Sequence, residues 1–120
     1  MIDASITFLR VADLQRSRAF YDALGLDLVL DQGGCLIYRV SSSGYLGVCE
    51  RADPGSTGVI VTFVTDDVAD WHDRLVAAGA DVDGPPRDNA DYRIHHFFAT
   101  DPDGHLLEVQ RFWDEGWAGG

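Results

Sequence analysis

Apolar and polar positions alternate along the chain in an order that occurs twice. The stretches rich in β-branched, aliphatic or aromatic residues are predicted strands, and they cover residues 5–11, 26–31, 34–40, 45–50, 59–65, 81–82, 92–100 and 105–112. Two amphipathic stretches are predicted helices. Each follows an aspartate in the N-cap position, Asp13 or Asp67, and ends at a glycine, Gly25 or Gly79. One strand, one helix and three strands therefore occur twice, which predicts an α+β fold.

The two halves match as an internal repeat. A shift of 54 residues places Asp13 on Asp67 and Gly25 on Gly79, and a shift of 61 places Gly47 on Glu108. The seven extra residues of the second copy are expected in the polar loop 84–91. We therefore divide a single domain, residues 1–120, into module one (1–53), module two (58–112) and a C-terminal tail (113–120).

Charge and composition narrow the classes of partner. The formal net charge is −11, and all nine basic residues are arginines, which argues against a nucleic-acid partner. The apolar stretches are too short to span a membrane, and the first residues do not resemble a secretory signal, so a cytoplasmic location is expected. Cys35 and Cys49 form no metal-binding spacing and are predicted to be reduced, buried residues.

Two motifs at opposite ends of the chain resemble the vicinal oxygen chelate superfamily, which includes glyoxalases, bleomycin-resistance proteins and extradiol dioxygenases. One is LRVADLQRS at 9–17, followed by FY at 20–21 and LG at 24–25, and the other is DPDGHLLEVQ at 101–110. The resemblance implies two βαβββ modules that form an open, curved, barrel-like sheet with the helices on its convex side. It also implies a small-molecule pocket on the concave side and a homodimer whose partner often completes that pocket.

Strand alternation assigns side chains to the two sides of each sheet, if the turns at 41–44 and 101–104 are four-residue loops. The side chains then expected in the pocket are Phe8, Tyr38, Tyr45, Arg93, His95, Phe97, Glu108 and Gln110. On the opening strand of the second module, the repeat also turns Ile60, Thr62 and Val64 inward. Glu108 is the candidate catalytic base or ligand anchor, with His95 as its diagonal neighbour. The alternative for Glu108 is a solvated carboxylate paired with an arginine.

Two further expectations concern residues near this region. His105 follows the turn glycine and is expected at the surface. The tail residues Trp113 and Trp117 are expected either to cover the pocket mouth or a dimer interface, or to pack against the edge of their own domain.

The resemblance also implies where a metal would bind, because metal-using members place ligands on the first and last strand of each module. The corresponding positions here are Ile6, Gly47, Ile60 and Glu108. Only Glu108 offers a donor atom, so no metal or other cofactor is expected. A divalent metal held with the help of Glu108 is the alternative.

These observations predict a metal-independent protein that binds an aromatic or cationic small molecule. Such proteins of the bleomycin-resistance branch confer antibiotic resistance by sequestering the drug. The alternative is an enzyme of the same superfamily, a glyoxalase-type lyase or isomerase or an extradiol-type dioxygenase, using Glu108 with or without a metal. A protein-interaction module without a small ligand is the third class considered.

Overall fold

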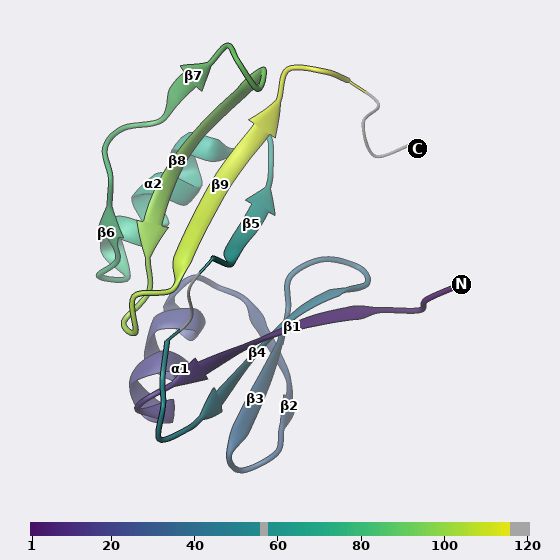
Figure 1. Cartoon of the computed structure of the whole chain (residues 1–120), viewed down its shortest axis with the longest axis vertical. Coiled ribbons are helices and arrows are strands. Elements are labelled where there is room, and N and C mark those ends of the chain that lie inside the picture. The colour runs from purple at the N-terminus through teal and green to yellow at the C-terminus, as the bar shows by residue number, and fades with distance from the viewer. Residues whose placement is uncertain (56–57, 116–120) are drawn as a thin grey trace.

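The computed structural model describes residues 1–55 and 58–115, arranged as two consecutive modules (Figure 1). The first module contains β1 (Ser5–Val11), α1 (Leu14–Ala23), β2 (Asp27–Asp31), β3 (Cys35–Arg39) and β4 (Gly44–Glu50). The second module contains β5 (Ile60–Val64), α2 (Val68–Ala77), β6 (Asp81–Val82), β7 (Arg87–Asn89), β8 (Ile94–Thr100) and β9 (Leu106–Phe112). The repeated strand–helix–strand order is therefore present, and the two helices are offset by the 54 residues of the repeat.

Each module forms its own mixed sheet. The first sheet has the order β1-β4-β3-β2, and the second has the order β5-β9-β8-β6 with β7 also paired to β8. In both sheets the opening strand runs parallel to the last strand, and the other pairs are antiparallel. The predicted α+β fold is confirmed, as two sheets of four and five strands without a closed barrel in the described part of the chain.

Local signals place both helices where the sequence predicts them. The Asp13 carboxylate accepts hydrogen bonds from the backbone N–H groups of Gln15 and Arg16 (3.0 and 3.2 Å), as an N-cap does. Asp67 occupies the equivalent position but makes no such side-chain bond. Both helices end before a glycine with positive φ, Gly25 (83°) and Gly79 (91°), a conformation that a side chain disfavours.

The extra residues of the second module do not form a loop throughout. Residues 87–89 form β7, which pairs with β8 at the registers Arg87–His96 and Asn89–Ile94. The prediction of a polar loop over 84–91 was therefore partly wrong. Polar side chains are compatible with a strand here because β7 is a short edge strand.

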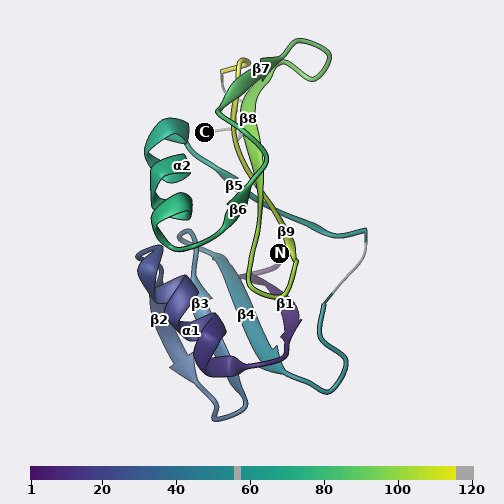
Figure 2. The ribbon, with the colours of Figure 1, turned by 90° about the vertical axis from the view of Figure 1, so that its left-hand side faces the viewer.

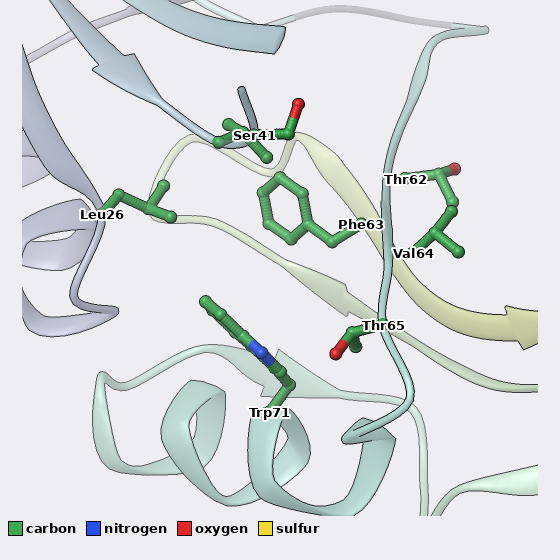
Figure 3. Close-up of a pocket in the computed structure, with 8 residues that line it drawn as sticks. Leu26, Ser41, Thr62, Phe63, Val64, Thr65 and Trp71 are labelled. Atoms are coloured by element: carbon green, nitrogen blue, oxygen red, sulfur yellow. The ribbon is translucent and has the colours of Figure 1, made fainter. Parts of the chain in front are cut away.

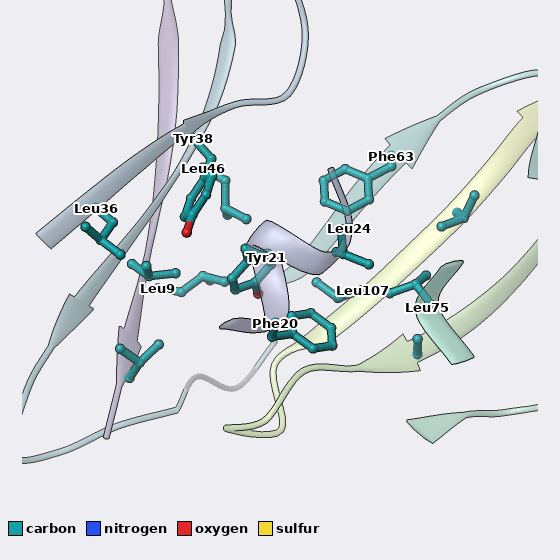
Figure 4. Close-up of a cluster of buried hydrophobic side chains, with 14 of the residues drawn as sticks. Leu9, Phe20, Tyr21, Leu24, Leu36, Tyr38, Leu46, Phe63, Leu75 and Leu107 are labelled. Carbon is teal, nitrogen blue, oxygen red and sulfur yellow. The ribbon is translucent and has the colours of Figure 1, made fainter. Parts of the chain in front are cut away.

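One hydrophobic core runs through both modules. Both helices lie on the same side of the molecule, beside their sheets (Figure 2). Between helices and sheets lies a cluster of buried side chains from both modules (Figure 4), which includes Leu9, Tyr21, Leu24, Phe63, Leu75 and Leu107. Burying a leucine or phenylalanine side chain contributes about 1.5–3 kcal/mol, so this shared core couples the two modules energetically.

The β8–β9 turn docks onto the first module through three hydrogen bonds, of which the one between Tyr21 and Asp101 is buried. The Tyr21 hydroxyl donates to Asp101 Oδ2 (2.8 Å), and Asp103 Oδ1 accepts from the Ala12 N–H (2.9 Å). His105 is buried, and its Nε2 donates to the Arg10 carbonyl oxygen (2.8 Å). The prediction that His105 lies at the surface was wrong, because this turn fills the joint between modules. Burial beside Asp101 also raises the pKa of the Tyr21 phenol well above its ordinary value.

Both long hairpins are one residue tighter than the sequence analysis assumed. The Val40 N–H donates to the Gly44 carbonyl oxygen, and the Asp101 N–H donates to the His105 carbonyl oxygen, so each loop has three residues. The closing glycine of the second loop, Gly104, has φ 81°, the left-handed conformation that a three-residue hairpin loop requires. A one-residue shift turns every side chain of a strand to the other side of the sheet. The predicted faces of β3 and β8 were therefore wrong.

The two cysteines are joined by a disulfide across β3 and β4, where Cys35 and Cys49 are direct partners with their Cα atoms 4.1 Å apart. The prediction of two reduced thiols was wrong. In the assumed register Cys35 would face Glu50 rather than Cys49, so the same one-residue error concealed the pairing.

In the described residues no helix has the length and apolar character needed to cross a bilayer.

Candidate functional site

The side of each sheet that faces away from the helices carries the predicted pocket residues, and we call it the open face. On the open face of the second sheet lies a hollow of about 440 Å³, which we call the second-sheet hollow. Strands β5, β8 and β9 provide most of its wall, and the segment before β8 completes it. Its lining consists of Ile60, Asn89, Tyr92, Ile94, His96, Phe98, Glu108, Gln110 and Phe112.

The polar centre of the second-sheet hollow is a contact between His96 and Glu108. His96 Nδ1 lies 2.8 Å from Glu108 Oε2, and the two side chains are only 8% and 12% exposed. The other carboxylate oxygen, Glu108 Oε1, accepts a hydrogen bond from the Thr62 hydroxyl (3.3 Å). Three adjacent strands thus hold one carboxylate and one imidazole in a fixed arrangement among apolar walls.

The structure places His96, and not His95, beside Glu108. His96 is paired with Gln110 and lies diagonal to Glu108, on the same face. His95 faces the other way, and its Nδ1 lies 2.8 Å from Asp88 Oδ1. The predicted partner of Glu108 was therefore wrong by one position, whereas Glu108 and Gln110 lie on the predicted face.

Two other predicted pocket residues of this module also lie elsewhere. Phe97 is fully buried in the core beneath α2, where the centres of its ring and the His72 ring lie 4.9 Å apart. Arg93 is exposed and forms an ion pair with Asp114 (2.9 Å) outside the second-sheet hollow. The assignment of Phe97 failed because of the same register shift in β8. Arg93 precedes that strand and has a left-handed backbone conformation (φ 57°), so strand alternation does not apply to it.

In the first module Phe8 and Tyr45 lie on the open face, and Tyr38 does not. Tyr38 is fully buried, and its hydroxyl donates to Asp22 Oδ1 (2.9 Å) on α1. Phe8, which is 52% exposed, lies across Gly47 so closely that a Cβ added there would clash with its ring. The prediction that Tyr38 lines the pocket was wrong, because the three-residue loop at 41–43 turns it toward the helix.

The residues at the four expected metal positions do not fit a divalent metal. Ile6 and Ile60 have no donor atoms, and the Phe8 ring occupies the space that a side chain on Gly47 would need. Glu108 already accepts hydrogen bonds from His96 and Thr62. Within residues 1–55 and 58–115, no three His, Cys, Asp or Glu side chains are grouped to hold a metal ion.

A second cavity of about 440 Å³ lies between the two modules (Figure 3). Phe63 and Trp71 line it from the second module, and Leu26 and Ser41 line it from the first. Its lining contains hydroxyl groups but no ionisable side chain. It can accommodate an apolar group, and it offers no group for acid–base chemistry.

The tail is described only as far as Glu115. The Trp113 N–H donates to the Arg93 carbonyl oxygen (2.9 Å), and the Arg93 guanidinium lies 5.6 Å from the centre of the Trp113 ring. Trp113 thus packs against the edge of its own domain, as one of the two alternatives predicted. The prediction for Trp117 lies outside the described residues.

Comparison with known proteins agrees with the fold and the motifs. The family model of the Glyoxalase/Bleomycin resistance protein/Dioxygenase superfamily matches residues 4–109. The chain belongs to this superfamily. The resemblance of the two terminal motifs to the vicinal oxygen chelate proteins is thereby confirmed. A search of curated proteins gave no significant match to this superfamily member.

Several solved structures share the fold over most of the chain. A glyoxalase/bleomycin resistance protein/dioxygenase from Nocardioides is 20% identical with a TM-score of 0.76, covering 97% of this chain and 87% of its own. TioX from Micromonospora sp. ML1 is 22% identical, with a TM-score of 0.75, and the match covers 90% of this chain and 97% of TioX. A glyoxalase/bleomycin resistance protein from Albidiferax ferrireducens T118 is 26% identical, with a TM-score of 0.75, and the match covers 89% of this chain and 97% of that protein.

Sequence reasoning missed His96 and Thr62 as parts of the candidate site. Thr62 was placed on the open face by the repeat, and only its contact with Glu108 was not foreseen. The alternation in β8 could not identify His96, because the segment IHHFFAT has an apolar and a polar residue on each side. In the first module, the two cysteines could have indicated the correct register. The register that pairs Cys35 with Cys49 also turns Tyr38 toward the helix and away from the open face.

Proposed function

We propose that this superfamily member binds a small aromatic or cationic molecule in the second-sheet hollow, without a metal. The observation that supports this most directly is a hollow of about 440 Å³ with apolar and aromatic walls around one buried polar pair. Ligand sites are commonly of this size and composition, with few polar groups that orient the ligand. The net charge of −11 favours the approach of cations over anions.

The test is a ligand screen by thermal shift, using planar aromatic and cationic compounds, antibiotics included. Glu108→Gln keeps the shape of the hollow and removes its charge, and Glu115→Gln is the matched control at the surface. Stabilisation that is weakened in Glu108→Gln and kept in Glu115→Gln would support the proposal. Stabilisation by no compound, or equal responses in both variants, would contradict it. Antibiotic resistance by sequestration would then be tested by expressing the wild type and Glu108→Gln in a sensitive bacterium.

We also propose that the functional form is a homodimer. Ile6, Phe8, Ile60 and Val64 are each more than 40% exposed on the open faces, and β1 and β5 are both edge strands. Exposed apolar side chains beside unpaired strand edges are typical of surfaces that associate. Sedimentation should give twice the 13.2 kDa of one chain. A concentration-independent monomer would contradict this proposal.

The cytoplasmic location stays a proposal, and the disulfide provides its test. Disulfides are uncommon in reducing cytosol, so Cys35 and Cys49 should be found reduced when cells are lysed into an alkylating reagent. A fully oxidised pair under these conditions would contradict the location.

The second candidate function is an enzyme of the same superfamily that uses Glu108. The contact between His96 and Glu108 favours it, because a histidine oriented by a carboxylate is a common acid–base unit. The misfit at the four metal positions counts against the metal-dependent glyoxalase-type and dioxygenase-type reactions.

A further inference from the structure

The contact between His96 and Glu108 fixes which imidazole nitrogen carries the proton. An ionised carboxylate can only accept hydrogen bonds, so at 2.8 Å from Glu108 Oε2 the Nδ1 atom of His96 must be the donor. In a neutral imidazole the other nitrogen, Nε2, then holds a lone pair and is the basic atom.

That basic atom is open to the second-sheet hollow. His96 lines the hollow, and in the described part of the chain its Nε2 has no hydrogen-bond partner. No buried side-chain nitrogen or oxygen among these residues lacks a partner, so Nε2 must reach the accessible space of the hollow. A ligand in this space would meet a proton acceptor on an otherwise apolar wall.

The surroundings hold the pair in place before any ligand arrives. The Thr62 hydroxyl fixes the second oxygen of Glu108 from β5, and the Phe98 ring packs edge-on against His96 with centroids 5.3 Å apart. Three strands therefore determine the orientation of the imidazole. A preorganised base of this kind needs little rearrangement during proton transfer.

We propose that His96 is a general base for a planar, apolar substrate with an acidic C–H bond, and that Glu108 is its positioning residue. This inference rests on the proposed binding of a small molecule in the second-sheet hollow. A new bond forms between Nε2 and the proton as the C–H bond breaks. The electron pair of that bond passes into the substrate's own π system, and Glu108 stabilises the imidazolium. The step consumes no oxidant, reductant or metal.

The probe is 5-nitrobenzisoxazole, a flat aromatic compound with one acidic C–H bond. When a base removes that proton, the C–H electron pair forms the third bond of a nitrile and the N–O bond breaks. The ring opens to a single coloured product, a cyanophenolate. A positioned general base contributes about 100-fold or more, so kcat/KM should fall about 100-fold in His96→Gln. His95→Gln is the matched comparison, because His95 has the same 2.8 Å contact with a carboxylate on the other side of the strand.

Each result of this assay bears on the proposal. Loss of turnover in His96→Gln with unchanged turnover in His95→Gln is expected. Equal activity of His96→Gln and wild type, or loss in His95→Gln alone, would overturn it. Binding of the probe is followed separately by the NMR shifts of the Ile60 and Ile94 methyl groups, which line the hollow. Bound probe without turnover contradicts the role of His96, whereas absence of binding counts against the proposed function.

A measurement without substrate tests the positioning role of Glu108. In a long-range ¹H–¹⁵N spectrum, Nδ1 of His96 should carry the proton in the wild type, although free imidazole side chains favour the Nε2–H form. Glu108→Gln should shift His96 toward the Nε2–H form and lower kcat/KM. An Nε2–H form in the wild type would overturn the inference whether or not any probe binds.

Discussion

The hydrogen bond between Tyr21 and Asp101 tests how the two modules are joined. Tyr21 lies on α1 of the first module and Asp101 in the β8–β9 turn of the second, and both are buried. In Tyr21→Phe the ring remains, so no cavity forms, and Asp101 keeps its bonds from the N–H groups of Asp103 and His105 (2.9 and 2.8 Å). The loss is thus one hydrogen bond to a charged group.

A hydrogen bond of that kind contributes about 1.5–3 kcal/mol to the free energy of unfolding. For a domain of this size, a loss of about 2 kcal/mol lowers Tm by about 8 °C. Urea denaturation should show a lower midpoint with an unchanged slope, since the area exposed on unfolding is the same. Tyr92→Phe is the control, because Tyr92 is 76% exposed. A loss below about 0.5 kcal/mol in Tyr21→Phe, or an equal loss in both variants, would refute this description of the joint.

Three further predictions concern the first module. Reduction of the Cys35–Cys49 disulfide, which spans 14 residues, should lower the free energy of unfolding by about 3 kcal/mol in urea titrations; equal midpoints with and without reductant would contradict this. Gly47→Ala should lower the free energy of unfolding by about 1–3 kcal/mol, because the added Cβ meets the Phe8 ring. The double variant with Phe8→Ala should recover part of that loss, and a double variant whose loss equals the sum of the two single losses would argue against the contact. Burial and the bond to Asp22 raise the pKa of Tyr38, so the folded state keeps a proton that the unfolded state loses above pH of about 10. Tyr38 should therefore lower the free energy of unfolding by about 1.4 kcal/mol per pH unit above that pH, in addition to the contribution of Tyr21, whose pKa is also raised. Tyr38→Phe should show a slope against pH that is shallower by this amount, and an unchanged slope would contradict the prediction.

The elements predicted correctly are those determined by neighbouring residues. The Asp13 cap and the Gly25 stop depend on residues close in the chain, and the apolar pattern of β1 is also local. The repeat transferred the strand, the helix and the glycine stop to the second module, although Asp67 makes no capping bond there. The internal repeat also placed Ile60 and Thr62 on the open face without any knowledge of the second sheet.

The errors come from features that a local pattern does not determine. Whether the hairpin at 101–105 has three or four loop residues changes no local preference, yet it decides whether Phe97 or Phe98 accompanies Glu108. The docking of His105 against Arg10 joins residues 95 positions apart, so its burial depends on how the modules pack. Each of these depends on register or packing at long range.

The proposed binding of a small molecule on the open face of the second module, around His96 and Glu108, can be observed at neighbouring methyl groups. The chain has five isoleucines, of which Ile60 and Ile94 line the second-sheet hollow. The most direct measurement is a titration of protein with ¹³C-labelled isoleucine methyl groups against a planar aromatic compound that stabilises it. Saturable shifts of the Ile60 and Ile94 methyl signals are expected, and they should be lost in His96→Gln or Glu108→Gln. Saturable binding that leaves both methyl signals unmoved would contradict it.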